Sequence, residues 1–210
     1  MIASESHLYL MCRIQNGIKN NMKNLSDYIM VIDDCIDLDS CNSLMTKFDS
    51  CEEVIKRDAS WEKDYRSFYE LNISRQSEFE DETSIVYEAT KSIYKFYEQK
   101  CGIEFFPQTY GFEDARMKRY DNNDHDQIGW HTDVGDYVSA RRYLVMFYYL
   151  NAVEEGGETV FEDKVNDKCL SVKPKPGRVV VFPSMWMYPH KGMKPISNQK
   201  YIISTYAHYQ

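Results

Sequence analysis

The hydrophobic and polar positions of this chain change their period near residue 102. Before it, residues 28–32 form a short apolar run that ends at Asp33 and predicts a strand. Apolar residues then recur every three to four positions within 39–50, where Asp39 can cap a helix, and again within 84–101. Gly102 is placed to end the second helix. Residues 57–82 follow no single period and predict a mixture of loop and strand.

Each predicted helix has one apolar face that should pack into a core. In the first helix this face holds Cys41, Leu44, Met45 and Phe48. In the second it holds Ile85, Ala89, Ile93 and either Phe96 or Tyr97. Aromatic residues at helical spacing belong to a core far more often than to a cofactor site, so we assign them to the core.

After residue 102, short apolar segments alternate with turn signals and predict seven strands. They span 115–120, 129–133, 142–150, 158–161, 169–172, 178–182 and 201–206. Seven short strands separated by turns predict a sandwich or a barrel. The runs 143–150 and 179–182 do not alternate, so we expect these strands to be buried on both faces, against the opposite sheet and against the N-terminal helices. No repeat or linker divides the two halves.

Composition supports one globular unit. The 210 residues include 43% hydrophobic side chains, enough for a core without disulfides or metals as staples. No apolar run approaches the roughly 20 residues that span a bilayer, and the first 12 residues lack the pattern of a secretory signal. The six cysteines form no C-x-x-C pair and no dense framework, so we expect free thiols in a reducing compartment, the cytoplasm.

The net charge of −8 is unevenly distributed. Residues 1–110 hold 12 basic and 20 acidic side chains, whereas residues 111–210 hold 13 of each. The second half therefore has no basic excess to neutralise phosphates, which argues against a nucleic-acid partner. The acidic balance of the first half is typical of a surface that keeps a protein soluble.

Three residues of the second half could bind one metal ion. His131 and Asp133 are two apart in a predicted strand and so share a face, and His190 follows the buried strand 178–182. His131 and Asp133 alone are weak evidence for a metal site, since chance places roughly one such pair in a chain of this composition. Two imidazoles and one carboxylate on one face of the metal suit non-haem Fe(II). Lys200 opens the last strand and could pair with an acidic co-substrate.

Six segments together resemble the Fe(II)/2-oxoglutarate-dependent dioxygenases, and most closely the compact single-domain prolyl 4-hydroxylases. They are Val31-Ile32-Asp33-Asp34-Cys35-Ile36, His131-Thr132-Asp133, Tyr148-Tyr149-Leu150-Asn151, Glu155-Gly156-Gly157-Glu158-Thr159-Val160-Phe161, Pro174-Lys175-Pro176-Gly177-Arg178, and His190-Lys191-Gly192 followed by Lys200-Tyr201. The resemblance spans residues 28–206. It implies an α+β protein whose core, about 112–208, is a double-stranded β-helix, also called a jelly roll. The supporting helical region would span 39–101 of a domain at 25–210, after an N-terminal extension at 1–24.

The resemblance also implies a role for each site residue. His131, Asp133 and His190 would be the iron ligands, and Lys200 would pair with the distal carboxylate of 2-oxoglutarate. Tyr149 resembles a tyrosine that hydrogen-bonds that carboxylate, and Tyr120 one that lines the pocket. The cofactors implied are Fe(II), 2-oxoglutarate and O2, with ascorbate as a further candidate. The presence of Asp133 argues against the related halogenases, which leave that ligand position open.

The substrate stays open at this stage. The resemblance favours a peptidyl proline in a peptide or protein partner, lying across loops at 57–82, 121–130 and 162–168. The alternatives are the same chemistry on a free amino acid, another protein side chain or a nucleobase, and a non-catalytic jelly-roll binding module. Trp61, Trp130 and Trp186 are candidate peptide contacts, although burial is the more common role of tryptophan. The sequence gives no indication of the oligomeric state.

Overall fold

Two helices precede most of the strands, as the change of period near residue 102 predicts. The structure is a computed structural model and describes residues 24–59, 65–163 and 168–210. Its helices are α1 (Leu38–Ser50) and α2 (Glu80–Cys101), with the 3-10 turns η1 (Leu25–Tyr28), η2 (Ile73–Arg75) and η3 (Ser77–Phe79). Its strands are β1 (Met30–Ile32), β2 (Ile55–Asp58), β3 (Arg66–Asn72), β4 (Tyr110–Phe112), β5 (Arg116–Tyr120), β6 (Gln127–His131), β7 (Arg142–Tyr149), β8 (Thr159–Asp163), β9 (Lys168–Val172), β10 (Val179–Pro183), β11 (His190–Gly192) and β12 (Lys200–Tyr209).

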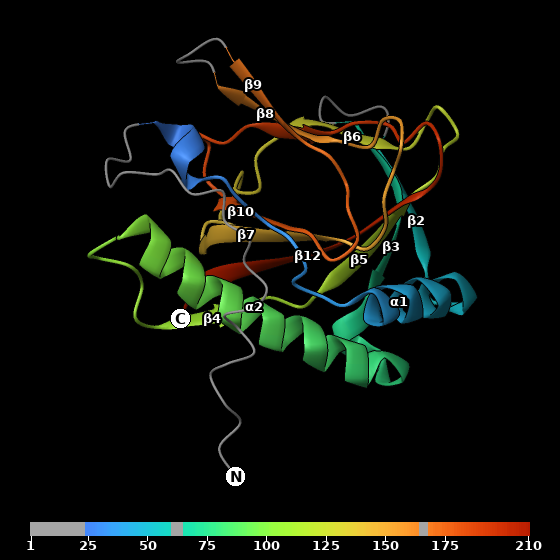
Figure 1. The fold of residues 1–210 in the computed structure, drawn as a ribbon, viewed down its shortest axis with the longest axis horizontal. Coiled ribbons are helices and arrows are strands. Elements are labelled where there is room, and N and C mark those ends of the chain that lie inside the picture. The colour runs from blue at the N-terminus through green and yellow to red at the C-terminus, as the bar shows by residue number, and fades with distance from the viewer. Residues whose placement is uncertain (1–23, 60–64, 164–167) are drawn as a thin grey trace.

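The described strands form one antiparallel sheet of 12 that rolls into a nearly closed barrel (Figure 1). Its main path runs β1-β10-β7-β12-β5-β3-β6-β11-β8-β9, while β2 pairs with β3 and β4 pairs with β12. Strand β3 pairs with β5 through residues 69–72 and with β6 through residues 66–67, so it carries the sheet from one wall of the barrel to the other. The expected double-stranded β-helix is confirmed.

The segment before the second helix is the mixture that its lack of period predicts. Strands β2 and β3 pair with each other, and the turns η2 and η3 then lead into α2. Strands β4 and β11 are additions to the predicted set, because each spans only three residues and leaves no alternation to detect. The other predicted strands are present with ends shifted by a few residues, which is the ordinary uncertainty of element boundaries.

The cap of α1 is Asp37, so the expectation that Asp39 begins this helix is wrong. Asp37 adopts an extended backbone, and its Oδ1 accepts a hydrogen bond from the Ser40 amide over 2.8 Å. Asp39 instead lies in the first turn, where a negative charge complements the helix dipole. The face predicted for the core is confirmed, with Leu44 and Phe48 fully buried.

Helix α2 starts at residue 80 and buries a face that is rotated from the predicted one. Val86, Thr90 and Ile93 lie in the core, whereas Ile85 is 40% exposed. The adjacent apolar pair Ile85 and Val86 fits two faces about 100° apart, and contact with the sheet selects the second face. The predicted end of this helix is confirmed, because Gly102 takes a left-handed φ of 58°.

The central strands β7 and β10 are buried on both faces, as their unbroken apolar runs predict. Met146 and Tyr148 pack with Leu44 in the cluster under the helices. Phe147 and Tyr149 point the other way, into the cluster that fills the barrel. Burial of each side chain of this size stabilises the folded state by about 1.5–3 kcal/mol. Packing against the helices therefore fixes the barrel wall that carries the site.

Two of the motif segments lie side by side although more than a hundred residues separate them. The Asp33 carboxylate binds the Arg178 guanidinium at 2.6 Å and the Lys175 ammonium at 3.0 Å. The Cys35 amide donates to the carbonyl of Gly177 over 2.7 Å. These contacts fasten the end of β1 to the turn before β10.

A second motif requires glycine at a close approach of the backbone. Gly156 and Gly157 both have a φ of 76°, and a Cβ at Gly156 would collide with the carbonyl of Lys194. This close approach explains why Gly156 stands at this position of the motif.

Several expectations fall outside the described residues, including most of the extension at 1–24, Cys12 and Trp61. Among the described residues, Cys41, Cys51, Cys101 and Cys169 are free thiols, as predicted. Within the described ranges, none of the helices has the length and apolar character needed to cross a bilayer.

Candidate metal centre and co-substrate pocket

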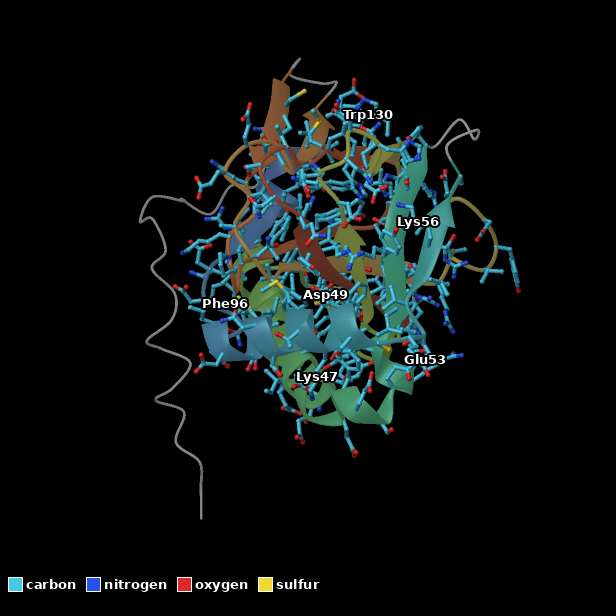
Figure 2. All side chains as sticks on the ribbon, turned by 90° about the vertical axis from the view of Figure 1, so that its right-hand side faces the viewer. Lys47, Asp49, Glu53, Lys56, Phe96 and Trp130 are labelled. Carbon is cyan, nitrogen blue, oxygen red and sulfur yellow. The ribbon has the colours of Figure 1, made fainter. Side chains whose placement is uncertain are left out.

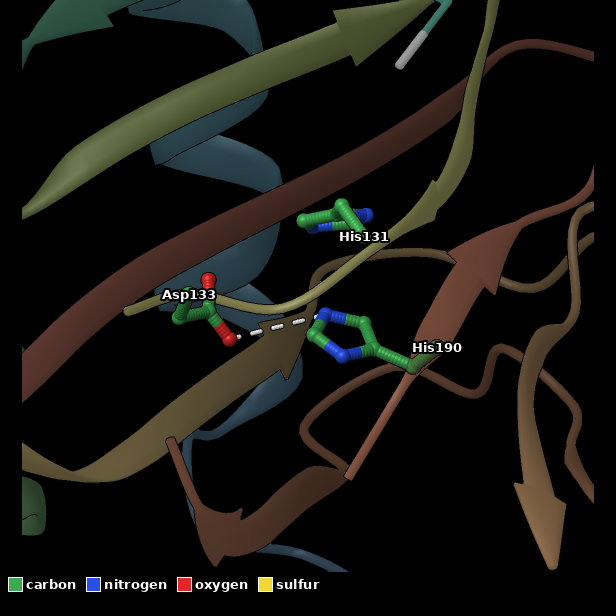
Figure 3. A group of neighbouring side chains, drawn as sticks. All are labelled: His131, Asp133 and His190. Atoms are coloured by element: carbon green, nitrogen blue, oxygen red, sulfur yellow. Dashed lines mark ion pairs between the residues drawn. The ribbon is translucent and has the colours of Figure 1, made fainter. Parts of the chain in front are cut away.

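His131, Asp133 and His190 converge at one point inside the barrel (Figure 3). One ligand atom from each lies within 4.8 Å of the other two. His131 is the last residue of β6, Asp133 follows two residues later outside the strand, and His190 opens β11. The two histidines are directly paired across β6 and β11, which brings their ring centroids to 4.3 Å. The sheet register therefore assembles the trio that the sequence predicts.

Backbone carbonyls fix the orientation of both imidazoles. Nδ1 of His131 lies 2.8 Å from the carbonyl oxygen of Gly129, and Nδ1 of His190 lies 3.1 Å from that of Tyr188. A carbonyl can only accept, so each Nδ1 carries the proton in these hydrogen bonds. In the neutral ring each Nε2 then keeps its lone pair, and this tautomer is the one that binds a metal ion through Nε2.

The remaining polar atoms at this point fit a metal ion. Asp133 Oδ2 and His190 Nε2 are buried, lie 3.5 Å apart and have no hydrogen-bond partner within the described residues. Burying such atoms without a partner is costly, so they indicate a ligand. Burial, together with the neighbouring His190, lowers the pKa of His131 to about 4, which keeps that imidazole neutral at pH 7. The donor set and its protonation suit Fe(II).

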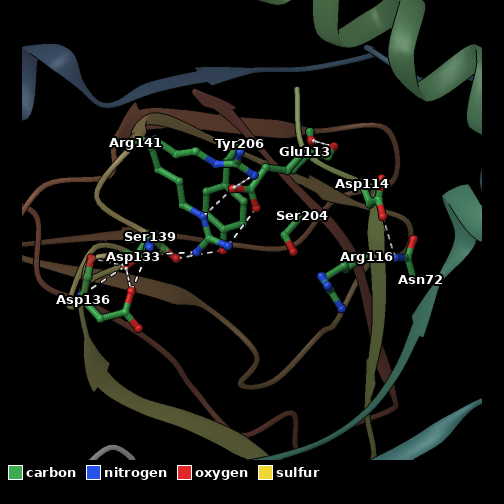
Figure 4. A network of polar contacts seen from close by, with 12 residues as sticks. Asn72, Glu113, Asp114, Arg116, Asp133, Asp136, Ser139, Arg141, Ser204 and Tyr206 are labelled. Carbon is green, nitrogen blue, oxygen red and sulfur yellow. Dashed lines mark hydrogen bonds and ion pairs between the residues drawn. The ribbon is translucent and has the colours of Figure 1, made fainter. Parts of the chain in front are cut away.

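A polar network holds the Asp133 carboxylate in place (Figure 4). The Tyr206 hydroxyl donates to Asp133 Oδ1 over 2.9 Å, which leaves Oδ2 for the metal. Burial raises the pKa of Tyr206 well above its usual value, so the hydroxyl remains a donor. The Arg142 guanidinium lies 4.0 Å from the Tyr206 ring and binds both carboxylate oxygens of Glu113 at 3.0 and 2.8 Å.

Lys200 lies in the same cavity, which has a volume of about 200 Å³. Only 2% of Lys200 is exposed, and its Nζ lies 5.4 Å from the ring centre of Tyr120 and 5.6 Å from that of Tyr149. The Tyr149 hydroxyl donates to Thr159 Oγ1 over 2.6 Å, and it is Thr159 that lines the cavity. Sequence reasoning missed Thr159, although it belongs to the Gly-Gly-Glu-Thr segment.

Burial lowers the pKa of Lys200 to about 7, and attraction to Glu158 offsets only part of this shift. A buried ammonium of this kind gains most from an anion that enters beside it. The cavity therefore offers metal ligands and a cationic anchor, the two requirements for a chelating dicarboxylate.

The wall of the cavity also carries charged residues that sequence reasoning missed. They are Arg66, Glu70, Arg116, Lys118 and Arg142. In the sequence these charged residues resemble a solvent-exposed surface. One signal could have located two of them: residues two apart in a strand share a face, so Lys118 and Arg116 lie on the same face of β5 as Tyr120.

An open mouth of about 800 Å³ leads to the metal ligands and is bordered by Trp130, Gly135 and Glu162. Trp130 is 40% exposed, with the Lys191 ammonium 4.8 Å from its ring centre. It lies near the top of the molecule in Figure 2, with Lys47 of α1 in the lower half. Trp186, which is 74% exposed, lies beside a separate apolar groove. The interpretation of Trp130 and Trp186 as buried structural residues is therefore wrong.

A second possible metal group, Cys51, Glu53 and Glu78, lies at the surface. Burial and the nearby acids raise the pKa of the Cys51 thiol to about 12, so this thiol is a poor metal ligand at neutral pH.

Comparison with known proteins agrees with this geometry. Residues 115–208 match the model of the 2OG-Fe(II) oxygenase superfamily, which confirms the resemblance expected from the sequence. No curated protein matches the chain.

Solved structures of prolyl hydroxylases share the fold. The viral collagen prolyl hydroxylase of Paramecium bursaria Chlorella virus-1, in its 2OG complex, has a TM-score of 0.65 at 20% identity, covering 87% of this chain and 97% of its own. The Trichoplax adhaerens prolyl hydroxylase, in complex with a hypoxia inducible factor peptide fragment, has a TM-score of 0.71 at 14% identity, with 87% and 84% covered. A Pseudomonas putida prolyl-4-hydroxylase has a TM-score of 0.62 at 16% identity, with 87% and 93% covered.

Proposed function

Over residues 115–208 the chain belongs to the 2OG-Fe(II) oxygenase superfamily, and we propose that it is an Fe(II)- and 2-oxoglutarate-dependent hydroxylase acting on peptidyl proline. The observation that carries the proposal is the convergence of His131, Asp133 and His190, with two buried ligand atoms that have no hydrogen-bond partner among the described residues. The finer assignment to proline is supported by the prolyl hydroxylases that share the fold.

The chain's own residues would bind, orient and exclude water. The Nε2 atoms of His131 and His190 and Oδ2 of Asp133 would hold Fe(II), with Tyr206 keeping the carboxylate turned toward it. Lys200 would neutralise the distal carboxylate of 2-oxoglutarate. When bound, iron, 2-oxoglutarate and O2 would supply an oxidative decarboxylation that yields carbon dioxide and succinate, with one oxygen atom of O2 entering succinate and the other the hydroxyl of the substrate.

Apolar walls would limit side reactions. Phe147 and Ile202 line the cavity together with the metal ligands and Lys200, where they would keep bulk water from the reacting atoms. The mouth on the side of Trp130 leaves a route for a peptide.

The same proposal includes ascorbate as a supporting reductant and a cytoplasmic location. Turnover measured with and without ascorbate tests the first, and localisation of the tagged chain tests the second.

A spectroscopic experiment tests the metal and co-substrate assignment. Anaerobic Fe(II) with 2-oxoglutarate should give the weak visible charge-transfer band of the chelate, and His131→Ala or Asp133→Ala should abolish it. His125→Ala is the matched control, because this exposed histidine contacts Tyr65 and lies outside the cavity. An unchanged band in both site variants would show that the assignment is wrong.

A turnover experiment tests the substrate. Proline-containing peptides should stimulate succinate release above the uncoupled rate, with hydroxyproline detected by mass spectrometry. Stimulation by a small molecule and by no peptide would exclude the prolyl assignment and leave the metal chemistry intact.

A further inference from the structure

Cations outnumber acids on the wall of the cavity that contains the candidate metal ligands. Among the described residues, five basic side chains line it: Arg66, Arg116, Lys118, Arg142 and Lys200. Two acidic side chains of the same described part line it: Glu70 and Asp133. A cavity that encloses such an excess favours the entry of an anion.

Binding of the metal and the co-substrate would not neutralise this excess of positive charge. The positive charges of Fe(II) and the Lys200 ammonium are balanced by the two carboxylates of 2-oxoglutarate and the carboxylate of Asp133. Arg142 is already neutralised by Glu113, which binds it through both oxygens. Three basic side chains, Arg66, Arg116 and Lys118, therefore share Glu70, the one acid left among the described residues of this lining. Burial lowers the pKa of Lys118, so an anion beside it would favour its ammonium form.

Glu70 is a weak partner for this group. It lies 3.4 Å from the Arg116 guanidinium and is also 3.3 Å from Arg57, a residue of β2 that is outside the cavity lining. Arg66 Nε is buried and has no hydrogen-bond partner among the described residues. Lys118 Nζ donates to the neutral hydroxyl of Ser204 over 3.1 Å. Cations held this way are costly unless an anion joins them.

Arg116 and Lys118 lie away from the end of the cavity that Lys200 occupies. Along β5, Tyr120 pairs with Lys200, Lys118 with Ile202, and Arg116 with Ser204. Arg116 is thus four residues further along the barrel, in the direction of Tyr206, and Figure 4 shows it pointing into the interior. Arg66 lines both the cavity and its mouth. A molecule that enters from the mouth meets this side first.

We propose that Arg66, Arg116 and Lys118, here called the basic wall, bind a carboxylate of the substrate, so that the hydroxylated molecule is acidic close to the oxidised carbon. This inference rests on the proposed function of the same site and narrows its substrate class. The carboxylate comes from an acidic side chain of a peptide or from a free α-carboxylate.

Matched pairs of probes separate the two sources. The first pair is a capped tripeptide whose proline is followed by glutamate and the same peptide with glutamine. The second pair is N-acetyl-L-proline and its amide. Acetate serves as the minimal probe. Binding is measured by calorimetry on protein loaded anaerobically with Fe(II) and 2-oxoglutarate, and again on metal-free protein.

The acidic member of at least one pair should bind at least about tenfold more tightly than its amide, as expected for a charge-assisted hydrogen bond. Arg66→Gln, Arg116→Gln and Lys118→Met should each reduce that preference. Arg57→Gln is the matched control, because Arg57 contacts the same Glu70 from outside the cavity and should leave the preference unchanged.

Equal binding of acid and amide in both pairs would overturn the proposal, as would the absence of binding by every carboxylate probe at millimolar concentration. A loss of 2-oxoglutarate affinity in the basic-wall variants, with substrate preference retained, would show that the wall serves the co-substrate instead. The charge-transfer band distinguishes a failure of the proposed function from a failure of the basic-wall proposal. Its absence contradicts the proposed function, whereas its presence without a preference for the acidic probes contradicts only the proposal that the basic wall binds a substrate carboxylate.

Discussion

The hydroxyl of Tyr206 donates a hydrogen bond to Oδ1 of Asp133 over 2.9 Å, and Oδ2 of the same carboxylate has no hydrogen-bond partner among the described residues. One oxygen is thus fixed by the protein and the other is free for a ligand. This division of the carboxylate underlies the first prediction.

Tyr206→Phe should lower Fe(II) affinity about tenfold, because partners that orient a metal ligand contribute at this level. Anaerobic titration with Mn(II) followed by electron paramagnetic resonance measures the effect. Tyr148→Phe is the control, since its hydroxyl bonds Thr90 on the helix side of β7. Equal affinity of the Tyr206→Phe variant and the parent would show that Asp133 needs no such support.

The metal ion should stabilise the fold by binding only the native trio. At a concentration 100 times its Kd, an ion stabilises the native state by about 2.7 kcal/mol, so Mn(II) or Ni(II) should raise the melting temperature and a chelator should reverse the rise. His190→Ala should lose this response. A chelator-sensitive rise that persists in His190→Ala would place the ion elsewhere.

The binding of 2-oxoglutarate should depend on pH through Lys200. Its pKa of about 7 lies below the usual 10.5, so Lys200 is largely neutral above pH 7 in the free protein. The distal carboxylate favours the ammonium form, so binding above pH 7 should take up a proton and weaken as the pH rises. Calorimetry in buffers of different ionisation enthalpy measures the uptake, which Lys200→Met should abolish.

The same pKa shift has a consequence for stability without ligand. The folded state binds fewer protons than the unfolded state between the two pKa values, so the cost of burying Lys200 is full below pH 7 and falls as the pH rises from about 7 to 10.5. Lys200→Met should flatten this part of the stability profile in urea denaturation. A parent and variant with parallel profiles would contradict the assignment.

Gly156→Ala should destabilise the protein by about 2 kcal/mol, since the new Cβ would meet the Lys194 carbonyl at a left-handed φ of 76°. Gly135→Ala is the control, because its Cβ would have open space and its φ is not left-handed. Urea midpoints compare the two. Similar midpoints would mean that the turn relaxes around the added methyl group.

The strand pattern was sufficient to predict a sandwich or a barrel and to suggest that His131, Asp133 and His190 share a metal ion, while the jelly roll and the roles of these residues followed from the resemblance of the motif segments. The sequence could not decide which of two nearby residues takes a given structural position. Asp37 and Asp39 are equally good caps, and only the backbone at Asp37 decides between them. Ile85 and Val86 are equally apolar, and only contact with the sheet turns Val86 inward.

The basic wall escaped prediction for a different reason. In β5, Met117 is buried among the residues under the helices, while Arg116 and Lys118 face the barrel cavity. The usual rule, apolar inside and charged outside, is inverted because the interior of this barrel is itself a binding cavity. A charged strand of this type cannot be distinguished from a solvent-facing one without the closure of the sheet.

Both imidazoles at the metal centre are oriented by the backbone two residues earlier in their own segment, Gly129 for His131 and Tyr188 for His190. Because main-chain carbonyls remain whatever side chains surround them, the metal-binding geometry is insulated from substitution in the cavity wall. New substrate preferences can therefore be introduced into this barrel, by evolution or by design, through side chains such as Arg116 without dismantling the centre that performs the oxidation.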